Sequence, residues 1–320
     1  MNTTINKLRD KIRFSDFPLG VYLLLAAVIA AFFAATQGTI SPSHLLNIVR
    51  QAAPLGVAAM GQTIVLLVGG IDLSVGATMS MVNLVAASVM MGDSRNVPAA
   101  IAISLGLCLA VGLVNGFIVA HFKMQPFLVT MAMSMVVEGG YYIYTKGIAK
   151  GSIATSFRYI SEGWLGFVPV AGIIWVALWG ILSTVLRRTT YGRRLYITGG
   201  NQATSRLSGF CSEGIVISAY VASALLAGVA GLLLSAYIGT ASTGVGSDYT
   251  LNSIAATVIG GTAFSGGIGS LAGTFPGVLI TVILQSMMTI VGISEAGKFI
   301  TQGIVIAVMV AINQMRKGRR

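Results

Sequence analysis

Residues 68–76 read Val-Gly-Gly-Ile-Asp-Leu-Ser-Val-Gly and interrupt a long run of apolar residues. Residues 259–267 read Ile-Gly-Gly-Thr-Ala-Phe-Ser-Gly-Gly and follow a second apolar segment. Aligned without gaps, the two stretches share glycine at their second, third and ninth positions and serine at the seventh. Such paired breaks indicate a weak internal repeat that borders a transport pathway, because unwound backbone is tolerated in a membrane only beside protein or water.

The composition indicates that lipid surrounds most of this chain. Of its 320 residues 55% are hydrophobic and only 9% are charged, whereas a soluble protein usually has about 25% charged residues. This balance excludes a soluble enzyme, a disulfide-rich scaffold and a disordered chain. The net charge of +11 does not indicate a nucleic-acid binder, because the basic residues lie between apolar runs and not on one exposed face with aromatics.

The apolar runs predict an all-α integral membrane protein with about ten transmembrane helices and glycine-broken segments. A spanning helix needs about 20 mostly apolar residues, and the eighth run is shorter than the others. The expected spans are residues 17–36, 52–69, 74–91, 97–120, 126–145, 172–186, 215–238, 252–263, 268–291 and 299–315.

Three clusters of Lys and Arg predict the orientation: one before Phe14, one between residues 187 and 206, and one after residue 315. Positive charge is retained on the cytoplasmic side, so both termini and the loop 187–214 are expected there. Six spans before this loop and four after it satisfy that condition. We therefore expect a basic cytoplasmic segment at 1–16, a single transmembrane domain at 17–315 and a basic tail at 316–320, with 146–171 outside.

Asp72 is the most informative polar residue of the first break. A carboxylate inside a membrane is costly unless it is hydrogen-bonded or faces water, so Asp72 either organises the broken backbone, which we favour, or binds a hydroxylated solute. Ser74, Asn115 and Asn252 either line a pathway or satisfy neighbouring helices. The candidate substrate pathway comprises these four residues and the glycines Gly69, Gly70, Gly260 and Gly261, whose alternative role is in tight turns or close helix contacts.

The chain has no motif for its own energy supply. No phosphate-binding loop is present, since Gly297-Lys298 is followed by Phe299 and not by Ser or Thr. Nucleophile-elbow, zinc-protease and paired-cysteine motifs are absent as well, so we expect no catalytic residue, metal or cofactor. The several intramembrane acids of an ion-driven carrier are also missing, so any pumping draws its energy from a partner.

Three blocks give the chain a family resemblance. Residues 69–76 resemble the signature of ABC-transporter permeases of the ribose/xylose/arabinose type. Tyr191-Gly192-Arg193, followed by Gly199-Gly200-Asn201 and by 206–209, resembles a second family block. Residues 254–256, 258–262 and 265–267 resemble a third. The blocks occur in the family's order, and the resemblance covers about residues 18 to 315.

The resemblance implies the permease subunit of an ATP-driven importer, which moves a monosaccharide or similar polyhydroxylated solute into the cytoplasm by alternating access. It also implies a cytoplasmic ABC ATPase that holds ATP and Mg²⁺, an extracytoplasmic solute-binding protein, a second permease chain, identical or related, and a bacterial inner membrane. The ATPase would dock on the coupling residues Gly199, Gly200, Asn201, Gln202, Ala203, Arg206 and Gly209. The arginines of this loop could instead serve only as positive-inside anchors.

Two departures from the family limit what the resemblance transfers. Relatives usually have Asn-Glu where this chain has Asn201-Gln202, which puts a salt bridge to the ATPase in doubt. They commonly have Arg-Gly where this chain has Glu138-Gly139, so the identity of the relatives' solute does not carry over to this chain. A stand-alone ion-coupled secondary carrier is the alternative function. A membrane-embedded enzyme is a third, although the catalytic cluster it needs is absent.

Overall fold

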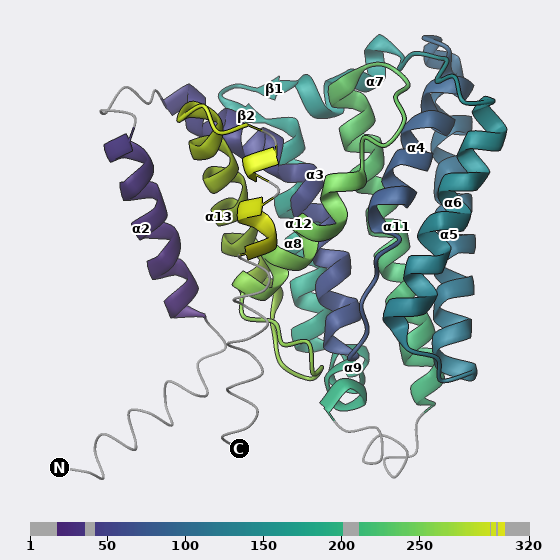
Figure 1. Cartoon of the computed structure of the whole chain (residues 1–320), viewed down its shortest axis with the longest axis vertical. Helices are drawn as coiled ribbons and strands as arrows, with labels where there is room; N and C mark the ends of the chain where they lie inside the picture. The colour runs from purple at the N-terminus through teal and green to yellow at the C-terminus, as the bar shows by residue number, and fades with distance from the viewer. Residues whose placement is uncertain (1–17, 36–41, 201–210, 295, 299, 305–320) are drawn as a thin grey trace.

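The computed structural model describes residues 18–35, 42–200, 211–294, 296–298 and 300–304. The described part is a helical bundle, in agreement with the predicted all-α membrane protein, and it carries one short β-hairpin (Figure 1). Its elements are α2 (Leu19–Ala35), α3 (Pro42–Leu67), α4 (Val75–Met90), η1 (Ser94–Asn96), α5 (Val97–His121), α6 (Pro126–Thr145), α7 (Thr155–Glu162), β1 (Trp164–Leu165), β2 (Val168–Pro169), α8 (Val170–Arg188), α9 (Thr190–Gly200), α11 (Ser212–Ile238), α12 (Ser247–Ile259) and α13 (Leu271–Ile290).

In the part of the chain that the structure describes, four helical segments are long and apolar enough to cross a membrane: Ser94–His121, Val170–Arg188, Ser212–Ile238 and Leu271–Ile290. Two shorter apolar helices, Leu19–Ala34 and Val75–Met90, accompany them. The predicted number of ten spans is therefore supported only in part. Helix α12, predicted as a span over 252–263, has 13 residues and reaches about 20 Å, less than the hydrocarbon core of about 30 Å.

The bundle has two ends, which we name after the helices that mark them. At the α7 end, the amide of Gly92 donates to the carbonyl of Ser152, and that of Ile153 donates to Gly239. At the α9 end, the amide of Gly267 donates to the carbonyl of Leu67. Figure 1 shows α7 and the hairpin at the top and α9 at the bottom. Both glycine breaks therefore lie at the same end of the bundle.

Helix α11 packs closely against α3 and α5 because glycine residues face it. A Cβ built on Gly112 would lie 2.7 Å from the Cα of Val221, and one on Gly116 equally close to the Cα of Ile217. A Cβ on Gly61 of α3 would lie 2.9 Å from the Cα of Ser223. Small residues permit this backbone approach, and packing and hydrogen bonds replace the hydrophobic effect between helices in lipid. Helix α11 is thus held tightly by its neighbours.

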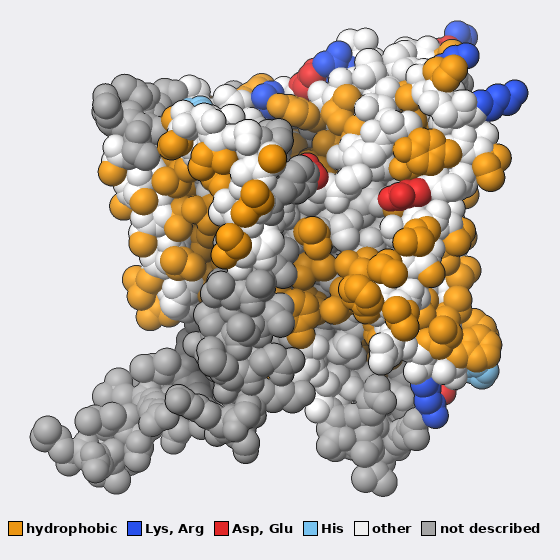
Figure 2. All heavy atoms as spheres, in the orientation of Figure 1, with side chains coloured by type: hydrophobic (Ala, Val, Ile, Leu, Met, Phe, Trp, Pro, Cys, Tyr) orange, Lys and Arg blue, Asp and Glu red, His pale blue; other side chains and the backbone are white. Residues whose placement is uncertain are grey.

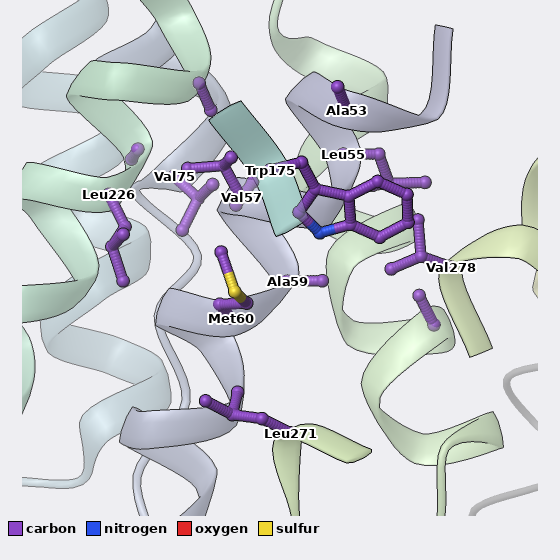
Figure 3. Packing of buried hydrophobic residues seen from close by; sticks show 14 of the residues in the cluster. Ala53, Leu55, Val57, Ala59, Met60, Val75, Trp175, Leu226, Leu271 and Val278 are labelled. Atoms are coloured by element: carbon purple, nitrogen blue, oxygen red, sulfur yellow. The ribbon is translucent and has the colours of Figure 1, made fainter. Parts of the chain in front are cut away.

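Trp175 of α8 fills the core on the other side of α3 (Figure 3). Its indole ring faces Gly56 and stacks on Phe275 with 4.4 Å between ring centroids. Trp175 is 1% exposed. The neighbouring Trp179 donates its Nε1 hydrogen to the carbonyl of Leu271 at 2.9 Å. Aromatic side chains therefore join α8 to α3 and α13.

The outer surface of the bundle has the distribution expected of a membrane protein. Large hydrophobic side chains of α5 and α6 are exposed, among them Phe117, Phe127, Met135 and Val136. Figure 2 shows hydrophobic side chains over the flank, while the Lys and Arg side chains in view gather at the two ends. A lipid environment stabilises this apolar flank and leaves the charged ends in water.

Candidate transport pathway

The first break ends α3 at a glycine with left-handed backbone geometry. Gly69 has φ of 80°, its amide donates to the carbonyl of Leu66, and the amide of Gly70 donates to Val65. This pair of bonds is the Schellman arrangement, which satisfies the last carbonyls of a helix. The chain then runs without helix as far as Ser74, and α4 begins at Val75.

At the second break α12 ends with the same pair of hydrogen bonds. They lie one residue later in the chain than the ungapped alignment of the two breaks predicts. Gly261 has φ of 89° and donates to Val258, and Thr262 donates to Thr257. Gly261, and not Gly260, is therefore the structural equivalent of Gly69. The breaks also differ in length, because α13 begins only at Leu271. The sequence alignment identified the two corresponding breaks but placed them in the wrong register.

The two breaks contact each other and the end of α9. The bond from the Gly267 amide to the Leu67 carbonyl, 2.9 Å long, joins them directly. Gly199 lies against the Leu67 carbonyl, and a Cβ built on it would also come within 2.8 Å of the Gly267 nitrogen. The hydroxyl of Tyr196 donates to the carbonyl of Gly269 at 2.8 Å. A displacement of α9 therefore acts on both breaks.

Asp72 organises the first break through three hydrogen bonds to its carboxyl group. Oδ1 accepts from the amide of Ser74 at 3.0 Å and from the Ser74 hydroxyl at 2.6 Å. Oδ2 accepts from the hydroxyl of Ser223 on α11 at 2.8 Å. In the amide orientation that satisfies both of its polar atoms, Gln62 Nε2 donates to the Asp72 carbonyl at 3.1 Å and Gln62 Oε1 accepts from the Asp72 amide at 3.3 Å. Asp72 is 1% exposed, and its contacts join α3, the break and α11.

The same cluster includes Asn115 of α5, whose Nδ2 donates to the Ser74 hydroxyl at 3.0 Å. The carbonyl of Ile71 accepts from Thr130 of α6 at 3.2 Å and from Tyr220 of α11 at 3.4 Å. Ser74 and Asn115 are each 1% exposed. The structure thus brings Asp72, Ser74 and Asn115 together as a buried network between helices. Their part in solute passage stays a prediction.

Asn252 lies apart from that network, beside a polar cavity of about 320 Å³ toward the α7 end. Its Oδ1 accepts from Nε2 of Gln285 on α13 at 3.0 Å and from Nε2 of Gln302 at 2.7 Å. Tyr237 and Thr289 also line this cavity. Within the described part of the chain, the lining of this cavity brings amide, hydroxyl and aromatic groups together inside a largely apolar bundle.

Charged side chains border the same cavity. The Arg50 guanidinium lies 5.5 Å from the ring centroid of Tyr237 and 6.0 Å from that of Trp164. Its buried Nε makes no hydrogen bond to any residue that the structure describes. Asp248 and Lys298 complete the charged lining. Stacking on the aromatic rings stabilises the cation and holds it at the cavity wall.

A second cavity, of about 290 Å³, lies at the α9 end. Gly69 and Gly70 line it together with Thr198 of α9, Lys123 of the α5–α6 turn and Glu213 of α11. The predicted pathway glycines of the first break therefore face an opening. Gly260 instead packs on α13, where a Cβ would lie 2.6 Å from the carbonyl carbon of Gly273.

Of the predicted coupling residues, the structure describes Gly199 and Gly200. Gly199 packs against the breaks, whereas Gly200 has open space where a Cβ would be. Asn201, Gln202, Ala203, Arg206 and Gly209 lie outside the described residues.

Comparison with known proteins decides the family. A family profile described as "Branched-chain amino acid transport system / permease component" matches residues 44–312. The chain belongs to this permease family. The ribose import permease protein of Escherichia coli strain K12 is 34% identical over 88% of this chain and 91% of its own length. Its namesake in Bacillus subtilis strain 168 is 34% identical over 93% of both chains.

A third relative of the permease carries a different sugar in its name. The galactose/methyl galactoside import permease protein of Treponema pallidum is 28% identical over 92% of this chain and 61% of its own length. No solved structure matches this permease. Within its described residues, no group of three or more His, Cys, Asp or Glu side chains could hold a metal ion.

Among the cavity residues of the permease that sequence reasoning missed are Arg50, Tyr237, Gln285 and Gln302. Each stands in a stretch that reads as part of a helix, where a single polar residue carries no mark of a site. The one available signal was the presence of amides in apolar runs, since Gln285 is the single amide of the predicted span 268–291 and Gln302 is the first amide of the span 299–315. Only the packing of α12 against α13 and against residues 300–304 brings Asn252 to them.

Proposed function

We propose that this chain is the membrane-spanning subunit of an ATP-driven importer, which moves a monosaccharide or similar polyhydroxylated solute into the cytoplasm by alternating access. The observation that carries the proposal is the match to the ribose import permease of E. coli over 91% of that protein's length. The polar cavity agrees with it, because amide and hydroxyl groups in a concave site bind a hydroxylated solute.

The proposal assigns partners to both ends of the bundle. A cytoplasmic ABC ATPase, which carries ATP and Mg²⁺, docks at the α9 end on the loop 187–214, and an extracytoplasmic solute-binding protein delivers solute at the α7 end. A second permease chain completes the pathway in a bacterial inner membrane. Both termini are cytoplasmic in this arrangement, in accordance with their positive charge.

The contacts of α9 provide a route from the ATPase to the pathway. Docking on Gly200 and the residues after it would displace the end of α9, where Gly199 and Tyr196 touch both breaks. Closure of the ATPase on ATP would thereby open the bundle toward the outside, and hydrolysis would reset it. Asp72 acts in this scheme as the anchor that holds the first break to α11.

The first experiment is affinity purification of the tagged chain in mild detergent, with mass spectrometry of the proteins that copurify. We expect a stoichiometric ATPase with a phosphate-binding loop. The purified assembly is then placed in vesicles, and solute uptake is measured with ATP and without it. Recovery of the chain alone, with uptake that does not need ATP, would refute the proposal and favour the stand-alone secondary carrier.

A further inference from the structure

Three amide side chains lie at the boundary between the polar cavity and a third, apolar cavity of about 380 Å³. They are Asn252 of α12, Gln285 of α13 and Gln302 of the helical residues 300–304, and we call them the amide cluster. All three line both cavities. The amide cluster is therefore a boundary that a solute in either cavity would touch.

The hydrogen bonds inside the amide cluster leave both donors and acceptors free. Asn252 Oδ1 takes one hydrogen from Gln285 and one from Gln302. The Nδ2 group of Asn252 and the Oε1 atoms of both glutamines make no further hydrogen bond within the described ranges. These three groups are not among the fully buried polar atoms that lack a partner, so they are accessible from the cavities. A donor next to two acceptors matches a hydroxyl group, which donates and accepts at once.

The two cavities that meet at the amide cluster differ in the polarity of their linings, as the edge and the faces of a sugar ring differ in polarity. On the polar side lie Tyr237 and Gln51. On the apolar side lie Ala255, Met287 and Met288. A monosaccharide presents hydroxyl groups along its edge and C–H groups on its faces. The two cavities together have the size of ordinary ligand pockets, which are about 300–1,000 Å³.

We propose that the amide cluster recognises adjacent hydroxyl groups of a neutral polyhydroxylated solute as it passes between the two cavities. Asn252, Gln285 and Gln302 thereby determine which solutes the permease accepts. This inference rests on the proposed function, since it names the recognition element of that transport pathway. The competing explanation is that the three amides only hold α12, α13 and residues 300–304 together.

The test uses the full assembly with its copurified partners in vesicles. ATP-driven uptake of D-ribose and of 2-deoxy-D-ribose is measured for the wild type and for Gln285→Met, which keeps the size of the side chain and removes its hydrogen bonds. Gln302→Met is the second variant, in case the first does not assemble. Thr184→Val is the control, because Thr184 of α8 lines neither cavity and donates its hydroxyl hydrogen to the carbonyl of Gly180 in its own helix at 2.8 Å.

We expect the wild type to prefer D-ribose and the Met variants to lose about tenfold in this preference, because a site built to bind a hydroxyl rejects the analogue that lacks it. Stimulated ATP hydrolysis should continue, and Thr184→Val should keep the wild-type preference. Equal loss of both uptakes with an unchanged ratio would overturn the inference and leave the proposed function standing. Absence of ATP-driven uptake of these two sugars and of every other monosaccharide tried with the wild type would overturn both.

Discussion

Replacing Asp72 separates its structural role from a role in solute binding. In Asp72→Ala the amide and hydroxyl of Ser74 and the hydroxyl of Ser223 all lose their acceptor. A buried donor left without a partner costs about 1–3 kcal/mol, so three such donors cost about 3 kcal/mol at the least. Asp72→Asn keeps Oδ1 for both Ser74 bonds, and its new amide can donate to the Ser223 oxygen. We therefore expect Asp72→Asn to cost about 1 kcal/mol.

The assay is thermal unfolding of the detergent-purified assembly, followed by the fraction that stays monodisperse, together with ATP-driven uptake in vesicles. Asp72→Ala should unfold at a clearly lower temperature and assemble poorly, with Asp72→Asn close to the wild type in both respects. Ser223→Ala should lie between them, since it removes one of the three bonds. Wild-type thermal stability of Asp72→Ala would refute the reasoning. Normal assembly of Asp72→Asn with lost uptake would assign Asp72 to the solute pathway.

Three further predictions address packing, coupling and orientation. Gly61→Ala should destabilise the protein by about 1–3 kcal/mol, as overpacking does, because the new Cβ would lie 2.9 Å from the backbone of α11. Gly106→Ala, whose Cβ would have nothing within 4 Å, is the control in the same thermal assay. A Cβ on Gly200 would meet no described atom within 4 Å, so Gly200→Leu should leave the assembly intact and reduce stimulated ATP hydrolysis. Unchanged hydrolysis would count against docking at this position. The exposed Cys211 should react with an impermeant maleimide only from inside, and a cysteine replacing Ile148, 60% exposed, only from outside; the opposite pattern would reverse the predicted orientation.

The sequence predicted those parts of the fold that depend on neighbouring residues. Runs such as 97–120 and 215–238 became α5 and α11 with ends within three residues of the prediction. The prediction for α12 was less accurate, because hydropathy does not distinguish a helix that stops inside the bundle from one that crosses it. The register of the second break was also wrong, since the left-handed glycine is chosen by the hydrogen bonds of the helix end and either glycine fits the pattern.

The candidate site shows the same division between local and distant contacts. The bond between Asp72 and Ser74 spans two residues and follows from a carboxyl group placed just before a helix start. Its partner Ser223 is 151 residues away, and no spacing rule connects the two. The amide cluster is equally distant in sequence, since 50 residues separate Asn252 from Gln302. Contacts between helices decide such sites, and a single sequence does not display them.

The position of the glycine breaks explains how one small docking element could act on the whole pathway. Helices α3 and α5 pack backbone against backbone on α11 through Gly61, Gly112 and Gly116, so α11 is held closely to both. Helices α12 and α13 border two cavities, and they contact α3 through hydrogen bonds of Thr257 and Thr274. The end of α9 touches both parts, through Leu67 on one side and through residues 266–269 on the other. We therefore expect a displacement of α9 to act on the end of α3 and on the second break together, and through the second break on α12 and α13, which carry two of the three residues of the amide cluster.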